Sequence, residues 1–497
     1  MGDYNKIITQ TGISYLLRVA SIATAFFLFM ILTRRFTQQT FGVYNIIIIS
    51  ISLLSQILTL ALNKYINKEF PGRDKEYQRK VFSTIFIFMV MVLIFISSSL
   101  LLASYFLGNN FSFIQDYGTE IRLSILITFF CVLSYLFVSY FVGNKLVEIR
   151  SLISYITEHL WGLIIIASIL VLPINLKNVL IIRLSVVAAL SLYLIILLIR
   201  KNILTFDIKE FNRTILKTAL VFSIPLLPFI VSKWLISATD KYMILFYLGA
   251  EKVGQYSYVY SLLNIVYLFV NILNIVIGPY IYHAWNIKDR IKLNLLLNLL
   301  LKYCLLLGIP AIIGIWILDK EIVTLVSALK YINVVSLIPY LLLFPLFLVL
   351  AIALQHVLII QNKTKLIGII YTAAAVLNIV LNIILIPRLG IYGAAIATTI
   401  AHFLVFMLIF LSVKKDIEFR FNFINLHKIL IASFFMAFII NLFHPVNLFA
   451  KIFTIGLGVS LYAGGLYLLK TFSKKEISTF LDYLRVFRER ARQKETL

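Results

Sequence analysis

Cysteine and charge are both scarce in this chain of 497 residues. The two cysteines, Cys131 and Cys304, lie in apolar runs and have no CxxC partner. We therefore expect no disulfide framework and no zinc or cluster site, and we interpret both as small packing residues. Charged residues make up 13 % of the chain and apolar residues 61 %, whereas a soluble domain has about 25 % and about 45–50 %. This balance excludes a soluble globular protein and a disordered chain.

Motifs for catalysis are also missing from the sequence. There is no P-loop, so we expect no ATPase activity, and no paired carboxylates lie in a polar loop. We therefore predict that the protein is not an enzyme and that it holds no cofactor and no metal. A membrane glycosyltransferase or polymerase is an alternative, but the short loops on the predicted outer side argue against it.

Long apolar runs dominate the chain instead. Residues 81–115, 253–287 and 331–362 contain no Asp, Glu, Lys or Arg, and about 20 apolar residues cross a bilayer as a helix. The pattern predicts an all-α polytopic membrane protein with about 14 transmembrane helices. The expected spans are 12–33, 41–62, 81–107, 121–143, 151–172, 179–199, 218–246, 255–280, 297–318, 331–360, 366–386, 391–413, 427–442 and 449–469. Spans 218–246 and 331–360 contain prolines, so we expect them to be kinked or broken.

Basic residues predict the orientation of these spans. The chain has 45 Lys and Arg against 21 Asp and Glu. If the N-terminus is cytoplasmic, roughly three-quarters of the basic residues fall on the cytoplasmic side, as the positive-inside rule requires. We therefore expect both termini to be cytoplasmic, the lipid bilayer to be the main partner, and no nucleic acid to bind. Residues 470–497 combine apolar residues at helical spacing with arginines, which predicts an amphipathic helix on the anionic inner leaflet.

An internal repeat relates two turns of the chain. Gly42 and Tyr44 open one predicted helix, and Gly254 and Tyr256 open another 212 residues later. Six spans separate the two turns, so both copies face the same way, and transporters with parallel repeats place their site between the halves. We predict six-helix bundles at 1–217 and 218–426, two further transmembrane helices at 427–469, and a cytoplasmic tail at 470–497.

Three stretches resemble one family of transporters. They are Phe41-Gly42-x-Tyr44, then Asp240-Lys241 with Gly249, Gly254 and Tyr256, and the stretch Leu381 to Thr398 with its turn at Pro387, Gly390 and Gly393. These resemble polysaccharide-unit or O-antigen flippases of the Wzx type, within the multidrug/oligosaccharidyl-lipid/polysaccharide (MOP) exporter superfamily. Gly42, Gly254, Pro387, Gly390 and Gly393 would then be structural turn residues.

The resemblance implies both a fold and an activity. The fold would be MATE-like, with two six-helix bundles that enclose a central cavity and open alternately to each side. The substrate would be a polyprenyl-pyrophosphate oligosaccharide, moved from the inner to the outer leaflet of the bacterial cytoplasmic (inner) membrane. A polysaccharide polymerase and chain-length proteins would be partners in capsule or O-antigen biosynthesis.

Basic residues within the predicted spans are the first candidates for a substrate site. A charge inside a membrane span is costly and normally faces a cavity or a partner. Arg18 shares a helix face with Ser14 and Ser21, and its guanidinium suits phosphate oxygens, although it could instead reach the inner headgroups. Lys233 lies in the middle of its span and is the second candidate for the cavity.

Acidic residues and histidines within spans are candidates for ion handling. Asp240 lies two turns from Lys233 on the same face, so it could contribute to substrate or ion binding, or simply pair with Lys241. Glu158 and His159 could form a proton relay or a structural pair near the inner interface.

A polar and aromatic stripe marks the eighth span. Its members Asn264, Tyr267, Asn271 and Asn274 recur at helical spacing. Amides can hydrogen-bond sugar hydroxyls and rings can stack on sugar faces, so the stripe is a candidate sugar site. Hydrogen bonding between helices of the bundle is the alternative interpretation.

The sign of the charge inside the spans separates the remaining functions. Arg18 and Lys233 favour an anionic substrate, which supports the oligosaccharide-lipid flippase. A cation or drug antiporter of the same superfamily would need acidic residues in its N-terminal bundle. A flippase for a peptidoglycan precursor shares the expected span number and cationic cavity, so the sequence leaves it open.

Overall fold

The structure, a computed structural model, describes residues 2–107, 112–144, 146–170, 173–207, 210–414, 423–443, 445 and 447–471. Within these ranges the chain is almost entirely helical and has no strand. Among the described residues, thirteen helices are long and apolar enough to cross a membrane, and a shorter apolar helix covers Leu426–Asn441. The predicted all-α polytopic fold is therefore confirmed. The predicted tail helix lies outside the described residues, except for its first two.

The α-helices follow one another as listed here: α1 (Gly2–Arg35), α2 (Gln38–Leu58), α3 (Leu62–Glu69), α4 (Lys75–Phe106), α5 (Ser112–Gly143), α6 (Val147–Tyr155), α7 (Trp161–Ala167), α8 (Leu176–Arg200), α9 (Arg213–Ser223), α10 (Leu227–Leu248), α11 (Ala250–Asn286), α12 (Arg290–Ile317), α13 (Asp319–Ser327), α14 (Ile338–Leu341), α15 (Phe344–Ile360), α16 (Thr364–Leu389), α17 (Ile391–Val413), α18 (Phe423–Asn441) and α19 (Leu448–Leu468). A π-helix, η2 (Ile156–Leu160), joins α6 to α7. Helices suit a membrane because they satisfy every backbone donor and acceptor within one segment.

The two proline-containing spans are broken, as predicted. In the first, α9 ends at Ser223 and a 3₁₀ turn over Ile224–Leu226 leads into α10. In the second, a 3₁₀ segment over Ile332–Leu337 precedes α14 and α15. Proline lies in the first turn of each new helix, where its missing N–H removes no helical hydrogen bond.

The helices form two compact units. The first contains residues 1–260, 326–334 and 368–401, and the second contains 261–325, 335–367 and 402–497. This grouping follows the packing of helices, and the bundle boundaries at 217 and 426 stay a prediction.

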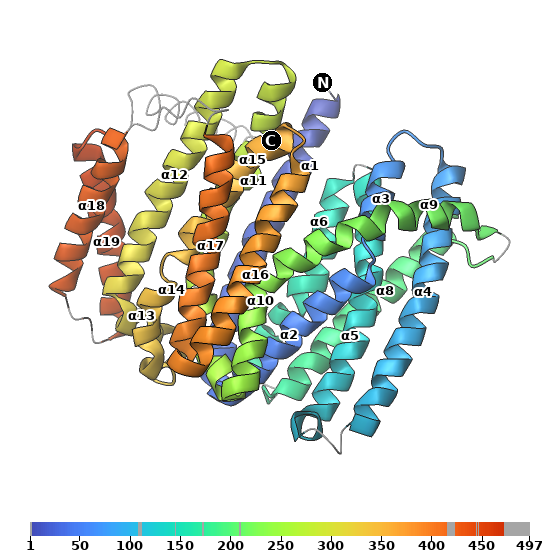
Figure 1. The fold of residues 1–497 in the computed structure, drawn as a ribbon, viewed down its shortest axis with the longest axis horizontal. Helices are drawn as coiled ribbons and strands as arrows, with labels where there is room; N and C mark the ends of the chain where they lie inside the picture. The colour runs from blue at the N-terminus through green and yellow to red at the C-terminus, as the bar shows by residue number, and fades with distance from the viewer. Residues whose placement is uncertain are drawn as a thin grey trace, which may run out of the picture. The chain divides into compact units, whose positions relative to one another are not determined.

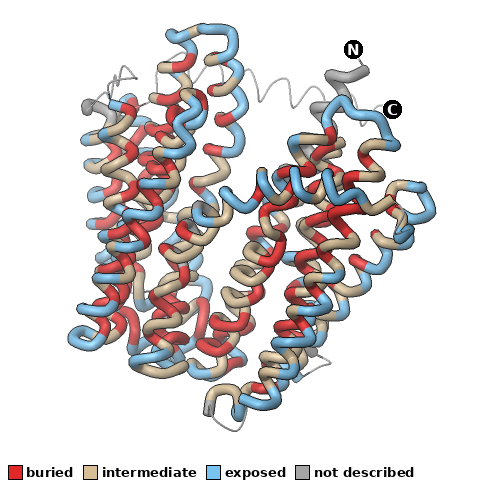
Figure 2. Tube along the Cα trace, turned by 45° about the vertical axis from the view of Figure 1, so that its right-hand side comes forward, coloured by how far each residue is buried: buried red, intermediate tan, exposed pale blue. Residues whose placement is uncertain are grey.

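Helix α5 is the centre of packing in the first unit. It packs against α2, α3, α4, α6 and α8 (Figure 1). Aromatic side chains fill the space: Phe82 stacks on Phe86, and both rings lie against Phe137 of α5. Buried residues accordingly follow the inner faces of these helices (Figure 2).

In the second unit, α12 packs against α15 and α18, and α18 packs against α19. The α18–α19 contact is close, because a Cβ on Gly458 would lie 2.4 Å from Cδ1 of Ile440. The Tyr462 hydroxyl of α19 donates to the backbone oxygen of Leu306 in α12 at 2.7 Å. These contacts attach the last two transmembrane helices to the remainder of their unit.

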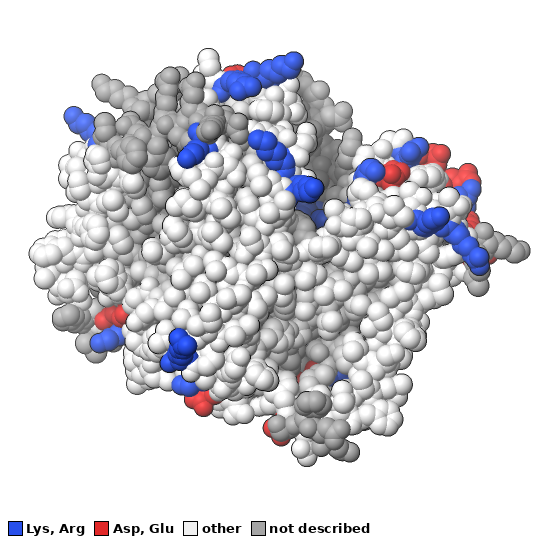
Figure 3. Space-filling view, in the orientation of Figure 1, with Lys and Arg blue, Asp and Glu red and all other residues white. Residues whose placement is uncertain are grey.

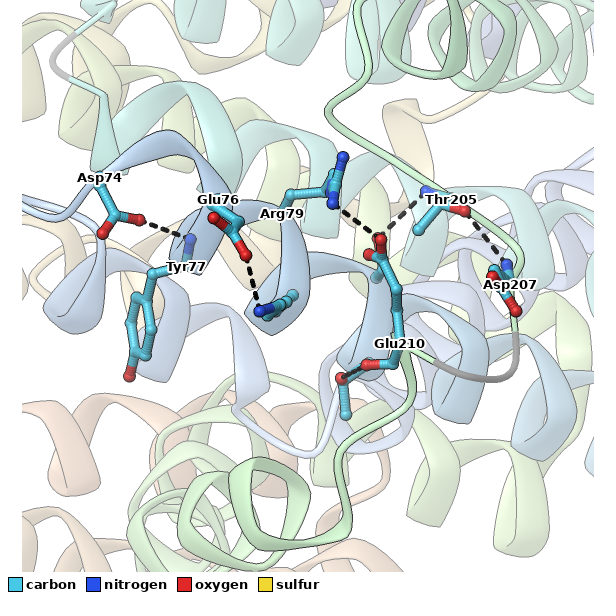
Figure 4. A network of polar contacts seen from close by, with 10 residues as sticks. Asp74, Glu76, Tyr77, Arg79, Thr205, Asp207 and Glu210 are labelled. Carbon is cyan, nitrogen blue, oxygen red and sulfur yellow. Dashed lines mark hydrogen bonds and ion pairs between the residues drawn. The ribbon is translucent and has the colours of Figure 1, made fainter.

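Charged side chains gather near the start of α4, whereas the surface along its length is uncharged (Figure 3). There the connection from α8 to α9 is tied to α4 (Figure 4). Arg79 forms an ion pair with Glu210 at 2.8 Å, and the backbone N–H of Thr205 donates to Ser83 Oγ at 3.1 Å. Asp74 caps α4 by accepting from the Tyr77 N–H at 2.6 Å. The chain that links the sixth and seventh spans is therefore held by specific contacts.

Candidate functional site

The two repeated turns meet each other in the structure. A Cβ on Gly42 would lie 1.9 Å from the backbone oxygen of Ala250, and a Cβ on Gly254 would lie 1.8 Å from that of Gln38. The contact is reciprocal. Gly42 of α2 lies against Ala250, the first residue of α11, and Gly254 of α11 lies against Gln38, the first residue of α2. Reciprocal contacts are what a two-fold relation between copies produces. The superposition of the two halves stays a prediction.

The turn between α16 and α17 is equally tight. Gly390 has a φ of +61°, and a Cβ on Gly393 would lie 2.4 Å from the backbone oxygen of Leu385. Pro387 lies within the last turn of α16, before the turn itself.

Tyr256, which belongs to the second repeated turn, leads to a buried carboxylate. The Tyr256 hydroxyl and the Thr398 hydroxyl both donate to Asp240 Oδ2, the latter at 3.1 Å. The Lys241 N–H donates to Asp240 Oδ1 at 2.8 Å. Asp240 and Tyr256 are completely buried, as is Thr398. Three donors from three helices thus converge on one carboxylate, an arrangement that suits its ionised, acceptor-only form.

Helix α16 contributes two further buried polar residues to the first unit. Asn378 and Asn382 are completely buried, and Asn382 Nδ2 donates to Asn378 Oδ1 at 3.0 Å. Asn382 Oδ1 has no hydrogen-bond partner among the described residues. Carboxylate, hydroxyl and amide oxygens are the ligands that hard cations prefer.

Lys241 is the nearest positive charge in sequence and is also buried. Its ammonium lies 4.6 Å from the centre of the Tyr260 ring, and the side chain is only 5 % exposed. Lys241 lies inside α10, which continues to Leu248.

Arg18 lies on α1 and is exposed. Hydrogen bonds on either side of it attach α1 to α6: Ser151 donates to Ser14 Oγ at 3.0 Å, and the Thr24 and Tyr155 hydroxyls are 3.3 Å apart. Arg18 is therefore held at a fixed height beside α6. The side chain of Lys233, the second predicted cation, lies outside the described part of the chain, so a shared cavity stays a prediction.

Glu158 and His159 lie on the π-helix η2. Their side chains approach to 3.9 Å between Glu158 Oε2 and His159 Nε2. A single π-helical turn within an α-helix is rare and is frequently found at functional sites. Helix α1, which carries Arg18, and helix α8, which carries Arg183, both pack against η2.

Arg183 was missed by the sequence analysis, which took Arg18 and Lys233 as the basic residues within spans. It lies inside α8, is 8 % exposed, and its guanidinium is 5.1 Å from the centre of the Trp161 ring. Its Nε and Nη1 atoms have no hydrogen-bond partner among the described residues. The signal was present, since Arg183 falls within the predicted span 179–199.

The polar stripe of the eighth span belongs to the second unit. Asn264, Tyr267 and Asn271 are partly buried, and Asn274 is 4 % exposed. Neither polar side-chain atom of Asn274 has a hydrogen-bond partner among the described residues. Two turns further along α11, the Tyr282 hydroxyl lies 2.8 Å from Nδ1 of His356. A role of the stripe in sugar binding stays a prediction.

Comparisons with known proteins agree with this architecture. Residues 225–384 match the MatE family model, and no curated protein matches the chain in sequence. The lipid II flippase MurJ in an inward closed conformation is 18 % identical with a TM-score of 0.72, over 93 % of this chain and 98 % of that one. The fold is that of MurJ.

MATE transporters share this fold as well. An inward-facing multidrug resistance MATE transporter of the MOP superfamily is 13 % identical with a TM-score of 0.64, over 81 % of this chain and 97 % of the other. A MOP superfamily transporter from Pyrococcus furiosus is 15 % identical with a TM-score of 0.54, over 82 % and 92 %. Residues 225–384 thus resemble the MatE family in sequence, and the chain shares its fold with MurJ and the MATE transporters.

Proposed function

We propose that this protein is a flippase that moves a polyprenyl-pyrophosphate oligosaccharide from the inner to the outer leaflet by alternating access. One observation carries the proposal: α1, which carries Arg18, and α8, which carries the buried Arg183, both pack against the π-helix η2. A diphosphate brings negative charge into a space between apolar helices, and this costs several kcal/mol unless cations meet it. A net positive site in a transporter-like fold suits that substrate.

The proposed substrate site combines the predicted residues. Arg18 would bind the diphosphate together with Lys233, and Asn264, Tyr267, Asn271 and Asn274 would contact the sugars. The MOP transporter from Pyrococcus furiosus is described as having a binding pocket of reversed polarity that suggests a different function. We take the sign of the charge in the N-terminal bundle as the feature that distinguishes an anionic substrate from the cationic drugs of an antiporter.

Asp240 is our candidate for the coupling-ion site. A buried carboxylate surrounded by donors can exchange a cation or a proton as the transporter changes conformation, and intramembrane carboxylates commonly do so. The donors from Tyr256 and Thr398 come from different helices, so a change in helix packing would change the affinity for the ion. Glu158 and His159 are the second candidate for this role.

A peptidoglycan-precursor flippase is the second candidate function. The structural likeness to the lipid II flippase MurJ, which extends over 93 % of this chain, favours it. Both candidates carry a saccharide on a lipid diphosphate and would use the same cations. Export measured with each of the two glycolipids, in vesicles that contain the purified protein, distinguishes them.

Arg18→Ala and Lys233→Ala should each abolish export while the protein stays in the membrane at normal levels. Each change removes a cation that offsets the diphosphate charge. Arg18→Lys should keep partial activity if charge alone matters, and little if the forked guanidinium is required. Cell-surface saccharide and membrane protein level are the two measurements. Wild-type export by both alanine variants would contradict the proposed site.

The proposed location is the bacterial cytoplasmic (inner) membrane, with both termini inside and with polymerase and chain-length proteins as partners. Single cysteines at Lys75 should react with a membrane-impermeant thiol reagent only after cell lysis. Cysteines at Thr40 and Asp116 should react in intact cells. Cys131 and Cys304 are buried, so a variant with both replaced is the background. Labelling of position 75 from outside would overturn the orientation.

A further inference from the structure

Helix α9 presents two cations and an apolar stripe on one exposed face. Arg213 and Lys217 are both exposed and lie four residues apart, about one turn along the helix. Val221 and Ile224 continue the same face and are 68 % and 51 % exposed. Within the described part of the chain, neither cationic side chain takes part in an ion pair or a hydrogen bond. The described residues thus supply no partner for either charge.

These side chains line a groove of about 430 Å³ along α9. Leu216 and Leu220, which are half-buried, line it as well, and it reaches Pro225 in the 3₁₀ break that follows the helix. The helical rise puts Arg213 and Ile224 about 16 Å apart along the axis. This length is close to the depth of one leaflet of the hydrocarbon core, about 15 Å. The groove is therefore long enough for a lipid chain, with its cations at one end.

The opposite face of α9 is packed into the protein. Ala219 and Ser223 are buried, and α9 packs against α3 and α4. The centre of the Phe222 ring lies 5.9 Å from that of the Tyr65 ring in α3. Rotating α9 to hide its exposed stripe would expose these buried side chains, which disfavours the rotation. The groove therefore stays on the outside of the molecule.

Helix α9 lies at the end of a membrane span. The stretch that is long and apolar enough to cross a membrane runs from Arg213 to Ile236, so its cations are near one membrane surface. Figure 1 shows α9 slanting across the molecule before the chain turns into α10 at the break. An amphipathic helix with cations on its polar side typically lies between headgroups and acyl chains, and its cations attract anionic lipids. Charge and apolar surface on α9 are thus arranged like the two parts of a membrane lipid.

We propose that this groove binds one anionic phospholipid, with its phosphate at Arg213 and Lys217 and an acyl chain along Leu220, Val221 and Ile224. Guanidinium and ammonium groups both bind phosphate oxygens through charge-assisted hydrogen bonds. The phosphate supplies the negative charge that the described residues do not, and the acyl chain covers the exposed apolar side chains. The bound lipid holds the segment that joins the sixth and seventh spans at the level of the headgroups. This inference does not depend on the proposed flippase function.

The experiment compares the wild type with the double variant Arg213→Gln/Lys217→Gln. Each purified protein is titrated with phosphatidylglycerol in a mild detergent, and native mass spectrometry counts the lipids that stay bound. The variant should bind its tightest lipid about 30-fold more weakly, because each cation near an anionic lipid surface contributes a factor of about five. Arg213→Lys/Lys217→Arg keeps both charges and should retain the lipid.

Two controls test whether the groove and the lipid charge are both required. Lys363→Gln/Lys365→Gln removes two exposed cations at the start of α16, outside the groove, and should retain phosphatidylglycerol as the wild type does. Phosphatidylcholine, which has no net charge, should bind the wild type and Arg213→Gln/Lys217→Gln equally weakly. Equal retention of phosphatidylglycerol by these two proteins would overturn the proposal.

Melting temperatures test the same site by a second measurement. A ligand that binds the folded protein raises its melting temperature, so phosphatidylglycerol should stabilise the wild type more than Arg213→Gln/Lys217→Gln. Two other results would each contradict the assignment to a phospholipid. Equal stabilisation of the wild type by inorganic phosphate would indicate a site for a free anion. Displacement of phosphatidylglycerol by an equimolar amount of polyprenyl diphosphate would indicate a site for the substrate.

Discussion

Gly42→Ala should prevent the protein from accumulating in folded form. The added Cβ would lie 1.9 Å from the backbone oxygen of Ala250 and 2.8 Å from the backbone nitrogen of Gly254. Backbone atoms of a helix cannot move aside singly, so α2 and α11 would have to separate by about 1 Å, and close-packed interiors resist such shifts. We expect a loss of at least about 3 kcal/mol, the upper part of the usual range for overpacking. Size-exclusion profile and melting temperature in detergent are the measurements.

Gly254→Ala should behave in the same way, because its Cβ would lie 1.8 Å from the backbone oxygen of Gln38. Gly464→Ala in α19 is the matched control, since nothing lies within 4 Å of a Cβ there. That variant should fold normally and be slightly more stable, because glycine is a poor helix former. Normal melting of Gly42→Ala would refute the contact between the two turns.

Asp240→Asn should abolish ion-driven transport and also weaken the fold. Lys241 is buried beside Asp240, so removing the carboxylate leaves an uncompensated buried cation, at a cost of about 3–5 kcal/mol. Loss of transport by misfolding would then be confused with loss of coupling. The informative variant is Asp240→Asn/Lys241→Gln, which removes both charges.

The double variant should recover melting temperature but not coupling. Flipping is measured in liposomes with and without an imposed cation or proton gradient, and the wild type should respond to one of the two. The variant should show the same slow rate in both conditions. Asp319→Asn, at the start of α13 and outside the spans, should leave the response intact. A gradient response that survives in the double variant would remove Asp240 from the coupling role.

The helical fold could be predicted because its signals are local. The length of an apolar run such as 81–115 directly predicts a helix that can cross a membrane. Paired prolines predict a break in the helix that contains them. The positions of glycines in the two turns were also visible in the sequence. That the turns contact each other was not, because the contact joins residues 212 positions apart.

The candidate site was predicted less completely for the same physical reason. Asp240 stands out in an apolar span, but its partner Thr398 is 158 residues away and has no unusual neighbours in sequence. Arg183 was missed although it lies within the predicted span 179–199, and the structure shows it to be buried. Its environment is set by α5, α7 and η2, which pack against α8. Neither the π-helix at Glu158 nor the contact of Arg183 with Trp161 has a local sequence signal.

The reciprocal contact of Gly42 and Gly254 has the form of a homodimer interface contained in one chain. An isologous patch is self-complementary, so a single copy of the repeat already carries everything needed to pair with a second copy. A six-helix ancestor could therefore assemble first and be joined into one gene later. Fusion of two such copies would then allow the two halves to diverge independently. Gly42 and Gly254 must both stay glycine, because a side chain on either one would break the contact that the two helices share.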